Sequence, residues 1–190
     1  MPGFLPLIGS LLLLLGLLVA AFFVFARVKS DYESHSKLSR PIAILQVGYF
    51  CAYALSSYAF LDSRLSHVGI AGPLLVLAFV LMVVGFLIVA LSMPFLGRQS
   101  FGSDVGSLRT SGIYRYSRNP QLVGGFLFIV GYALLWPSWS GALWAGLWLV
   151  IAQLMVRGEE AHLEGVFGDE FRAYCARTPR YVGVPGKRLS

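Results

Sequence analysis

Long apolar runs separated by short polar segments make up most of the chain. Five of these runs approach the ~20 residues that a helix needs to cross a bilayer, and they cover residues 4–26, 42–61, 68–93, 121–136 and 138–156. The fourth run is short for a hydrocarbon core of ~30 Å, so its N-terminal entrance is expected at the membrane surface or slightly below it. The pattern predicts an all-α, polytopic membrane protein with about five transmembrane helices.

The last two runs are predicted to form an antiparallel helical hairpin. The stretch WPSWS joins them, and its Pro137 leaves room only for a tight turn. Small side chains in the fifth run predict that this helix approaches a neighbour closely; they belong to Gly141, Ala142, Ala145 and Gly146.

Beyond the fifth run, apolar residues recur at helical spacing as far as Tyr174. This recurrence predicts an amphipathic segment that lies on the cytoplasmic interface. Gly165 and Gly168 are expected to interrupt the segment, and Pro179 begins an extended tail.

The basic residues predict the orientation in the membrane. All Lys and Arg residues except Arg64 lie in the segments that follow the first, third and fifth runs. The positive-inside rule places these segments in the cytoplasm, so the N-terminus is expected outside, and the C-terminus inside. The first run has no basic residue before it and too long an apolar core for a signal peptide.

The composition supports a membrane protein and limits its partners. Of the 190 residues, 57% are hydrophobic and 13% are charged, whereas soluble domains carry roughly a quarter charged residues. The net charge of +6 follows from the loop asymmetry, so nucleic acid is not expected as a partner. Cys51 and Cys175 fall in separate segments without metal-type Cys/His spacing, and no metal site is predicted.

The sequence shows no internal repeat, and residues 1–190 are predicted to form a single domain. Residues 1–107 read as plain spans, in which the polar side chains of the second run are expected to serve helix packing. Residues 108–190 hold the hairpin, the tail and the candidate chemistry.

The stretch TSGIYRYSRNPQLVGG, residues 110–125, concentrates polar groups at the entrance of the fourth run. Pro120 suits the first turn of a helix, and Asn119 is placed to cap that turn. The free N–H groups of the turn attract an anion. Gly124 and Gly125 are expected to leave the backbone open to a flat ligand.

Charged and aromatic side chains surround this entrance. Arg118 supplies a cation, Tyr116 a ring and a hydroxyl, and the hairpin brings Glu159 and Glu160 to the same membrane face. Each feature alone has an ordinary explanation, such as a topogenic arginine or an interfacial tyrosine. Carboxylates at the C-terminal end of a helix are unfavourable unless a cation lies near, so the combination favours a binding site.

Three pieces of the sequence together resemble the isoprenylcysteine carboxyl methyltransferase and phospholipid methyltransferase superfamily. They are RNPQLVG at residues 118–124, the pair Glu159-Glu160, and FGDEFRAYCARTPRYVGVP at residues 167–185. The superfamily pattern reads Arg-His-Pro-x-Tyr-x-Gly, then Glu-Glu after a helical hairpin, then a phenylalanine-glycine-acidic segment that ends near Arg-x-Pro. The likeness covers about residues 108–185.

The resemblance implies a five-helix membrane enzyme that uses S-adenosylmethionine. The cofactor would sit at the cytoplasmic end of the hairpin under the C-terminal tail, and a lipophilic acceptor would enter from the bilayer. The residues carried over to the cofactor site are Arg118, Asn119, Pro120, Leu122, Gly124, Glu159 and Glu160, with Tyr174, Arg177 and Arg180 in the covering tail. Arg157 is expected to orient an anionic acceptor, and Glu159 or Glu160 to take the proton from an amine acceptor.

Two positions depart from the superfamily pattern. Asn119 replaces the usual His, and Leu122 replaces the usual Tyr. Asn keeps a donor and an acceptor but does not titrate, and the phospholipid N-methyltransferase branch resembles this sequence in carrying Asn-Pro there. Leu122 removes a ring and a hydroxyl.

Four functions remain open at this stage. An isoprenylated thiol or carboxylate compound fits best as the methyl acceptor, and a phospholipid amine is the next candidate. An NADPH-dependent sterol or lipid reductase shares the motif but needs more helices than 190 residues provide. A non-enzymatic membrane relative is the last alternative.

Overall fold

A computed structural model describes residues 4–35, 38–61, 68–100 and 107–184, without the side chains of residues 4–7 and 93–100. These residues form α-helices joined by short connections, and no strand occurs among them. The elements are α1 (Phe4–His35), α2 (Arg40–Phe60), α3 (Gly72–Ser100), the 3₁₀ helix η1 (Gly112–Arg115), α4 (Pro120–Leu134), α5 (Trp139–Phe167) and α6 (Asp169–Arg177).

The predicted all-α, polytopic membrane fold is confirmed. Among the described helices, α1, α2, α3 and α5 are long and apolar enough to cross a membrane. The shorter apolar helix α4 has 15 residues, as expected for the short fourth run.

Three helices run further than their predicted spans, and one of them, α3, ends at Ser100 instead of residue 93. α1 continues to His35 instead of stopping at residue 26, and α5 continues to Phe167 instead of stopping at residue 156. The end of an apolar run marks the membrane surface, whereas charged residues such as Lys29 and Glu160 are good helix formers and let the helix continue. The extensions of α1 and α5 therefore stand at the membrane face where the candidate site residues gather.

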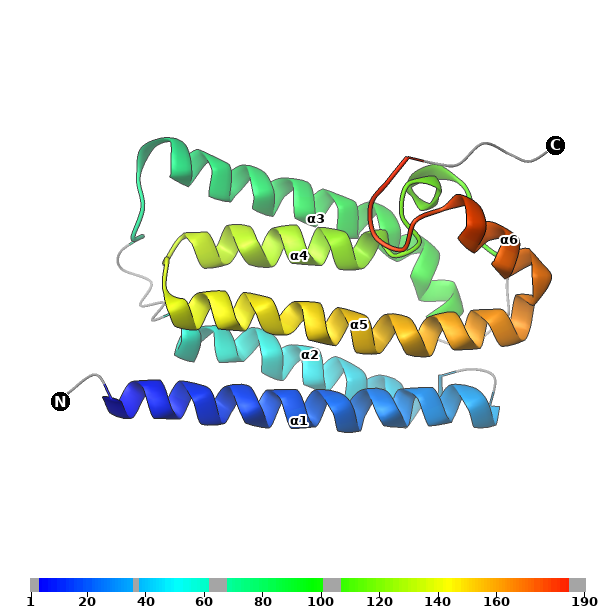
Figure 1. Cartoon of the computed structure of the whole chain (residues 1–190), viewed down its shortest axis with the longest axis horizontal. Coiled ribbons are helices and arrows are strands. Elements are labelled where there is room, and N and C mark those ends of the chain that lie inside the picture. The colour runs from blue at the N-terminus through cyan, green and yellow to red at the C-terminus, as the bar shows by residue number, and fades with distance from the viewer. Residues whose placement is uncertain (1–3, 36–37, 62–67, 101–106, 185–190) are drawn as a thin grey trace.

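α5 is the central helix of the bundle. Figure 1 shows α4 and then α3 on one side of α5, and α2 and α1 on the other side, in agreement with the contacts between these helices. α6 and the last described residues lie at one end of the bundle, beside the connection that leads into α4. The site described below is at that end.

The prediction that small residues let α5 approach a neighbour closely holds at Gly141, where a Cβ atom would lie 2.7 Å from the Leu61 side chain. A tighter approach, between backbone atoms, joins α3 to α4. A Cβ atom on Gly85 would lie 2.5 Å from the Gly124 carbonyl oxygen, and one on Gly131 would lie 2.6 Å from the Ala78 carbonyl oxygen. Gly146 of α5, in contrast, has open space beside it. The prediction that Gly124 is open to a flat ligand is also wrong, because α3 occupies that space.

The prediction that Gly125 is open to a flat ligand is also wrong, because a neighbouring helix occupies the space beside it. A Cβ atom on Gly125 would lie 2.6 Å from the Trp148 ring of α5. Gly125 thus lets α4 pack against α5, while Gly124 lets it pack against α3.

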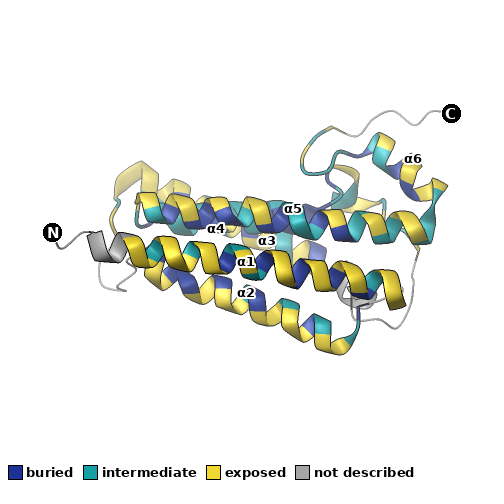
Figure 2. Cartoon of the chain, turned by 60° about the horizontal axis from the view of Figure 1, so that its bottom comes forward, coloured by how far each residue is buried: buried dark blue, intermediate teal, exposed yellow. Residues whose placement is uncertain are grey.

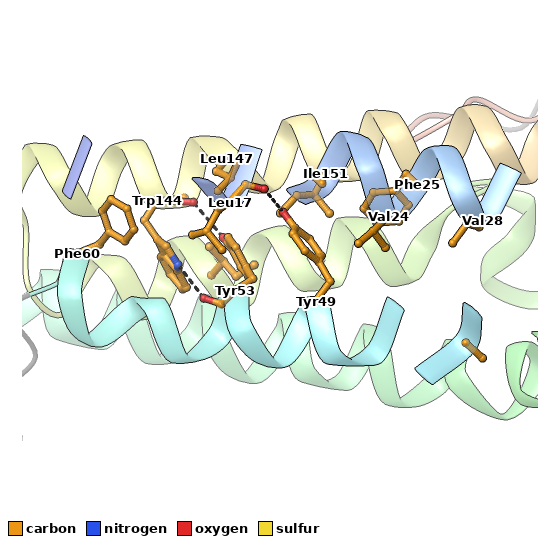
Figure 3. Packing of buried hydrophobic residues seen from close by; sticks show 14 of the residues in the cluster. Leu17, Val24, Phe25, Val28, Tyr49, Tyr53, Phe60, Trp144, Leu147 and Ile151 are labelled. Carbon is orange, nitrogen blue, oxygen red and sulfur yellow. Dashed lines mark hydrogen bonds between the residues drawn. The ribbon is translucent and has the colours of Figure 1, made fainter. Parts of the chain in front are cut away.

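Aromatic side chains with internal hydrogen bonds fill the core between α1, α2 and α5 (Figure 3). The Tyr49 hydroxyl donates to the Leu17 carbonyl, and the Tyr53 hydroxyl donates to the Trp144 carbonyl. The Trp144 indole N–H donates back to the Tyr53 carbonyl. These bonds satisfy polar groups away from water, which confirms that polar residues of α2 serve packing.

The outer faces of the bundle are apolar and exposed. In Figure 2 exposed and buried residues alternate along α1 and α2, and their buried faces turn towards the other helices. Phe22 and Phe23 of α1, for example, are more than half exposed. Such faces suit contact with lipid chains.

A single glycine separates α5 from α6. Gly168 has a positive φ of 50° and its N–H donates to the Glu164 carbonyl, so it ends α5. Gly165, which was also expected to interrupt the helix, lies inside α5. Arg172 of α6 bridges the corner by pairing with Glu164 and Asp169.

Candidate functional site

The candidate site lies where the strap, residues 178–184, crosses the N-terminal end of α4. Backbone hydrogen bonds hold the two segments together: the Arg118 N–H donates to the Pro179 carbonyl at 3.0 Å, and the Gly183 N–H donates to the Tyr116 carbonyl at 3.2 Å. The strap thereby covers the end of the hairpin that the sequence assigned to a cofactor.

Glu160 of α5 is at the centre of the charged part of the site. Its carboxylate lies 2.8 Å from Nη1 of Arg118, which precedes α4, and 2.5 Å from Nη2 of Arg180 in the strap. Nε of Arg180 donates to the same carboxylate at 3.1 Å. Three segments far apart in the sequence therefore meet on one side chain.

Arg118 and Glu160 are both largely withdrawn from water. Their side chains are 14% and 16% exposed, whereas Arg180 is 40% exposed. An ion pair with this burial is costly to break, because the remaining charge would be left without compensation. We regard the Arg118–Glu160 pair as the fixed part of the site, and Arg180 as its more accessible side.

Arg118 also contacts a residue that the sequence analysis did not assign to the site. Nη1 of Arg118 donates to Sγ of Cys175 in α6 at 2.7 Å. Burial raises the pKa of the Cys175 thiol, although the neighbouring guanidinium acts in the opposite direction. Nε of Arg118 is buried and has no partner among the described residues, which leaves one donor for a ligand.

Asn119 occupies the N-cap position of α4, but its side chain does not cap the helix. The amide Nδ2 instead donates to the Arg180 carbonyl at 3.1 Å. The predicted side-chain cap is thus wrong, because the strap carbonyl takes up the amide. Pro120 lies in the first turn, as predicted.

Leu122 forms part of an apolar wall below the charged groups. It is buried against Ala152 and Val156 of α5, and the Tyr181 ring of the strap packs against the same cluster. The Tyr181 hydroxyl donates to Oε1 of Gln153 at 2.7 Å, which fixes the strap from its other side. Where the superfamily pattern has a tyrosine in α4, a tyrosine of the strap contributes the ring here.

Several predicted residues do not take part in the ion pairs of Glu160. Tyr116 and Arg157 are exposed, and Arg177 donates to the Ala173 carbonyl of its own helix. Tyr174 is buried, and its hydroxyl donates to the Tyr114 carbonyl, so it fastens α6 to the segment before α4.

Glu159 points away from Glu160. Consecutive residues of an α-helix are about 100° apart, and no described Lys or Arg forms an ion pair with Glu159. The charges of Glu159 and Glu160 still act on each other, and that of Glu159 also acts on the phenols of Tyr32 in α1 and Tyr114 in η1. The two adjacent carboxylates therefore face different surroundings.

The residues of this site lie within a region that matches a known family. The model of the phospholipid methyltransferase family matches residues 73–170, more than half of the chain. The chain belongs to the phospholipid methyltransferase family. The match begins in α3, so the matched region includes the helix that packs against α4 as well as the hairpin.

Two individual proteins that this chain resembles come from yeasts. A protein-S-isoprenylcysteine O-methyltransferase of Schizosaccharomyces pombe is 34% identical over 96 residues, which are 46% of this chain and 39% of the relative. A phosphatidylethanolamine N-methyltransferase of Candida albicans is 28% identical over 69 residues, 36% of this chain and 8% of the relative. The chain thus matches less than half the length of either relative. No solved structure matches it.

Two residues of the site, Cys175 and Tyr181, were not predicted from the sequence. Cys175 and Tyr181 stand within the matching tail segment, but only their contacts with Arg118 and Gln153 connect them to the site. The available signal was that Tyr181 directly follows Arg180 and Cys175 directly follows Tyr174. Among the described residues, no group of His, Cys, Asp and Glu is arranged to hold a metal ion.

Proposed function

We propose that this protein transfers a methyl group from S-adenosylmethionine to a lipophilic acceptor held in the membrane, most like an isoprenylcysteine carboxyl methyltransferase. The observation that carries the proposal is the convergence of the three motif pieces. Arg118, Glu160 and Arg180 are far apart in the sequence and lie within ion-pair distance in the structure.

The donor set at this convergence fits S-adenosylmethionine. The unpartnered Nε of Arg118 suits a carboxylate. A carboxylate offers about four lone-pair sites, and the arginines use three on Glu160, which leaves one for an ammonium or a ribose hydroxyl. Leu122 and Tyr181 provide apolar surface for the adenine. The cofactor would supply a methyl group activated by the adjacent sulfonium.

In such a methyl transfer the residues of the chain mainly have to orient the reactants and exclude water. Sulfonium is a good leaving group, so orienting the reactants and excluding water account for much of the rate. The strap is held over the N-terminal end of α4 by its backbone bonds to Arg118 and Tyr116, and in this position it would exclude water from the reactants. Leu122 and Val156 form an apolar floor.

The acceptor is proposed from the relatives and from one residue of the site. The relative from Schizosaccharomyces pombe is named for isoprenylcysteine, and a prenylated cysteine carboxylate needs no base. A phospholipid amine is the second candidate, favoured by Asn119 and by the relative from Candida albicans.

A transfer assay tests the proposal. We expect labelled methyl from S-adenosylmethionine to appear in N-acetyl-S-farnesylcysteine or in a total lipid extract, and not in short water-soluble thiols or acids. Calorimetry in detergent should show binding of S-adenosylhomocysteine at about micromolar Kd, roughly −8 kcal/mol. Binding of NADPH instead would indicate a reductase, and binding of neither a non-enzymatic relative.

We further propose that the N-terminus lies outside, and that the site and the C-terminus face the cytoplasm. The proposal rests on the basic residues, of which Lys37, Arg64, Lys187 and Arg188 lie outside the described residues. Trp139, at the opposite end of the hairpin, is 88% exposed, and Val184 of the strap is 90% exposed.

These two exposed positions give a matched test of orientation. In a chain with Cys51→Ser and Cys175→Ala, a cysteine replacing Trp139 should react with an impermeant maleimide on intact cells. A cysteine replacing Val184 should react only after permeabilisation, because positive loops stay in the cytoplasm. Labelling of position 184 from outside would reverse the proposed orientation.

A further inference from the structure

The end of α5 at the site is contacted from two opposite sides. On one side Glu160 pairs with Arg118. On the other side the ring of His162 stacks on the ring of Tyr32 in α1, with the ring centroids 4.4 Å apart and the ring planes 17° apart. Glu160 and His162 are two residues apart, which separates their side chains by about 200° around an α-helix. The end of α5 is thus held between α1 and the segment that leads into α4.

A second contact between α1 and α5 lies one turn earlier. A Cβ atom on Gly158 of α5 would lie 3.9 Å from Cβ of Lys29 in α1, which is ordinary van der Waals contact. Lys29 and Tyr32 are three residues apart on α1, and Gly158 is four residues before His162 on α5. At these spacings the two contacts lie on one face of each helix. The two helices therefore stay side by side up to the level of the charged groups.

The end of α1 is itself fixed to the beginning of α2. Asp31 is 8% exposed, and its carboxylate accepts hydrogen bonds from the backbone N–H of Ser39 at 2.6 Å and from its hydroxyl at 3.0 Å. Hydrogen bonds to an ionised carboxylate are stronger than those between neutral groups, and Ser39 directly precedes α2. Tyr32, the residue after Asp31, is therefore presented to α5 from a fixed support.

This support comes from outside the region that matches the family. The match covers residues 73–170, which include Arg118, Glu160 and His162 but not α1. Sequence analysis likewise gave residues 1–107 no part in the chemistry. The stack on His162 is the printed link between α1 and the part of α5 that carries Glu160.

We propose that Tyr32 is a positioning residue: stacked on His162, it holds the end of α5 in the rotation that turns Glu160 towards the cofactor. This inference rests on the proposed function. Without the ring, the end of α5 is free to rotate or to tilt towards α1, and the Glu160 carboxylate then moves away from the guanidinium of Arg118. Because this buried pair depends on close geometry, the cofactor side loosens although no residue that would contact the cofactor has changed.

Binding of S-adenosylhomocysteine, measured by calorimetry on the purified protein in detergent, tests this role. Tyr32→Leu should weaken binding about three- to tenfold, the range that a stacked ring pair is worth. Tyr32→Phe keeps the ring and should bind like wild type. The control is the same change at a tyrosine of α2 that is 56% exposed, Tyr58→Leu, which should also bind like wild type. Equal binding by Tyr32→Leu and Tyr32→Phe would overturn the proposal.

A double variant separates positioning from a general loss of stability. If Tyr32 acts through Glu160, adding Tyr32→Leu to Glu160→Gln should weaken the binding of S-adenosylhomocysteine no further than Glu160→Gln alone. Two losses that multiply would show that Tyr32 acts by another route, and the proposal would be wrong.

Hydrogen exchange gives a readout that needs no ligand. Tyr32→Leu should speed the exchange of the backbone amides of residues 158–164 at the end of α5, and Tyr32→Phe should leave it unchanged. This pattern in a protein that binds no S-adenosylhomocysteine would support the role of Tyr32 in holding α5 and contradict the proposed methyl transfer. Conversely, if wild type binds S-adenosylhomocysteine and Tyr32→Leu changes neither exchange nor binding, the proposed function stands and the role of Tyr32 is refuted.

Discussion

Replacing Glu160 with glutamine should weaken the binding of S-adenosylhomocysteine by about 2–3 kcal/mol, roughly 30- to 150-fold. Glu160 is the only residue described here that pairs with both Arg118 and Arg180. Glutamine removes the negative charge and leaves the buried Arg118 guanidinium uncompensated. Since Arg180 is partly exposed and screened by water, most of the loss should come from Arg118. Isothermal titration calorimetry in detergent measures the effect.

Glu164→Gln is the matched control for this prediction. Glu164 is on the same helix and also pairs with an arginine, but its side chain is 52% exposed and that of Arg172 is 58% exposed. Exposed pairs contribute little to stability, so this variant should bind S-adenosylhomocysteine like wild type. If Glu160→Gln and Glu164→Gln bind equally well, the assignment of Glu160 to the cofactor is wrong.

Replacing Gly85 with alanine should destabilise the bundle by about 1–3 kcal/mol, the usual cost of overpacking a tight contact. The new Cβ would lie 2.5 Å from the Gly124 carbonyl oxygen and 2.6 Å from the Phe128 nitrogen. Both are backbone atoms, so α3 and α4 must move apart. The displacement would also shift the first turn of α4, and with it Arg118. Thermal unfolding in detergent should show a lower Tm, and calorimetry should show weaker binding.

Gly146→Ala tests whether the position of the glycine matters or only the residue type. Gly146 lies inside α5, and a Cβ there would meet nothing within 4 Å. Alanine is the better helix former by up to about 1 kcal/mol, so this variant should be as stable as wild type or slightly more stable. A Gly85→Ala protein with unchanged Tm would contradict the close α3–α4 packing.

The charged centre could be predicted only as a list of residues. Arg118, Glu160 and Arg180 each stand in a motif piece, so their types were visible in the sequence. Their mutual distances depend on how the strap crosses α4. Asn119 illustrates the limit, because its position predicts a helix cap, while the nearby Arg180 carbonyl takes its amide.

The glycines show a second limit of prediction. A glycine pair in the first turns of a helix is compatible with a close ligand or a close helix. Gly124 and Gly125 have the same residue type, and neither the ligand nor the neighbour is encoded locally. Only the packing of α3 on one side and of Trp148 on the other decides that both serve helix contacts.

The sequence by itself determined the membrane fold and the family resemblance. Apolar runs of bilayer length have few alternatives to helices in lipid, because every backbone polar group must be satisfied within the chain. The tertiary structure alone decided the separate surroundings of Glu159 and Glu160. Adjacent residues have nearly identical sequence contexts, but the rotation of an α-helix turns one towards Arg118 and Arg180 and the other towards Tyr32 and Tyr114.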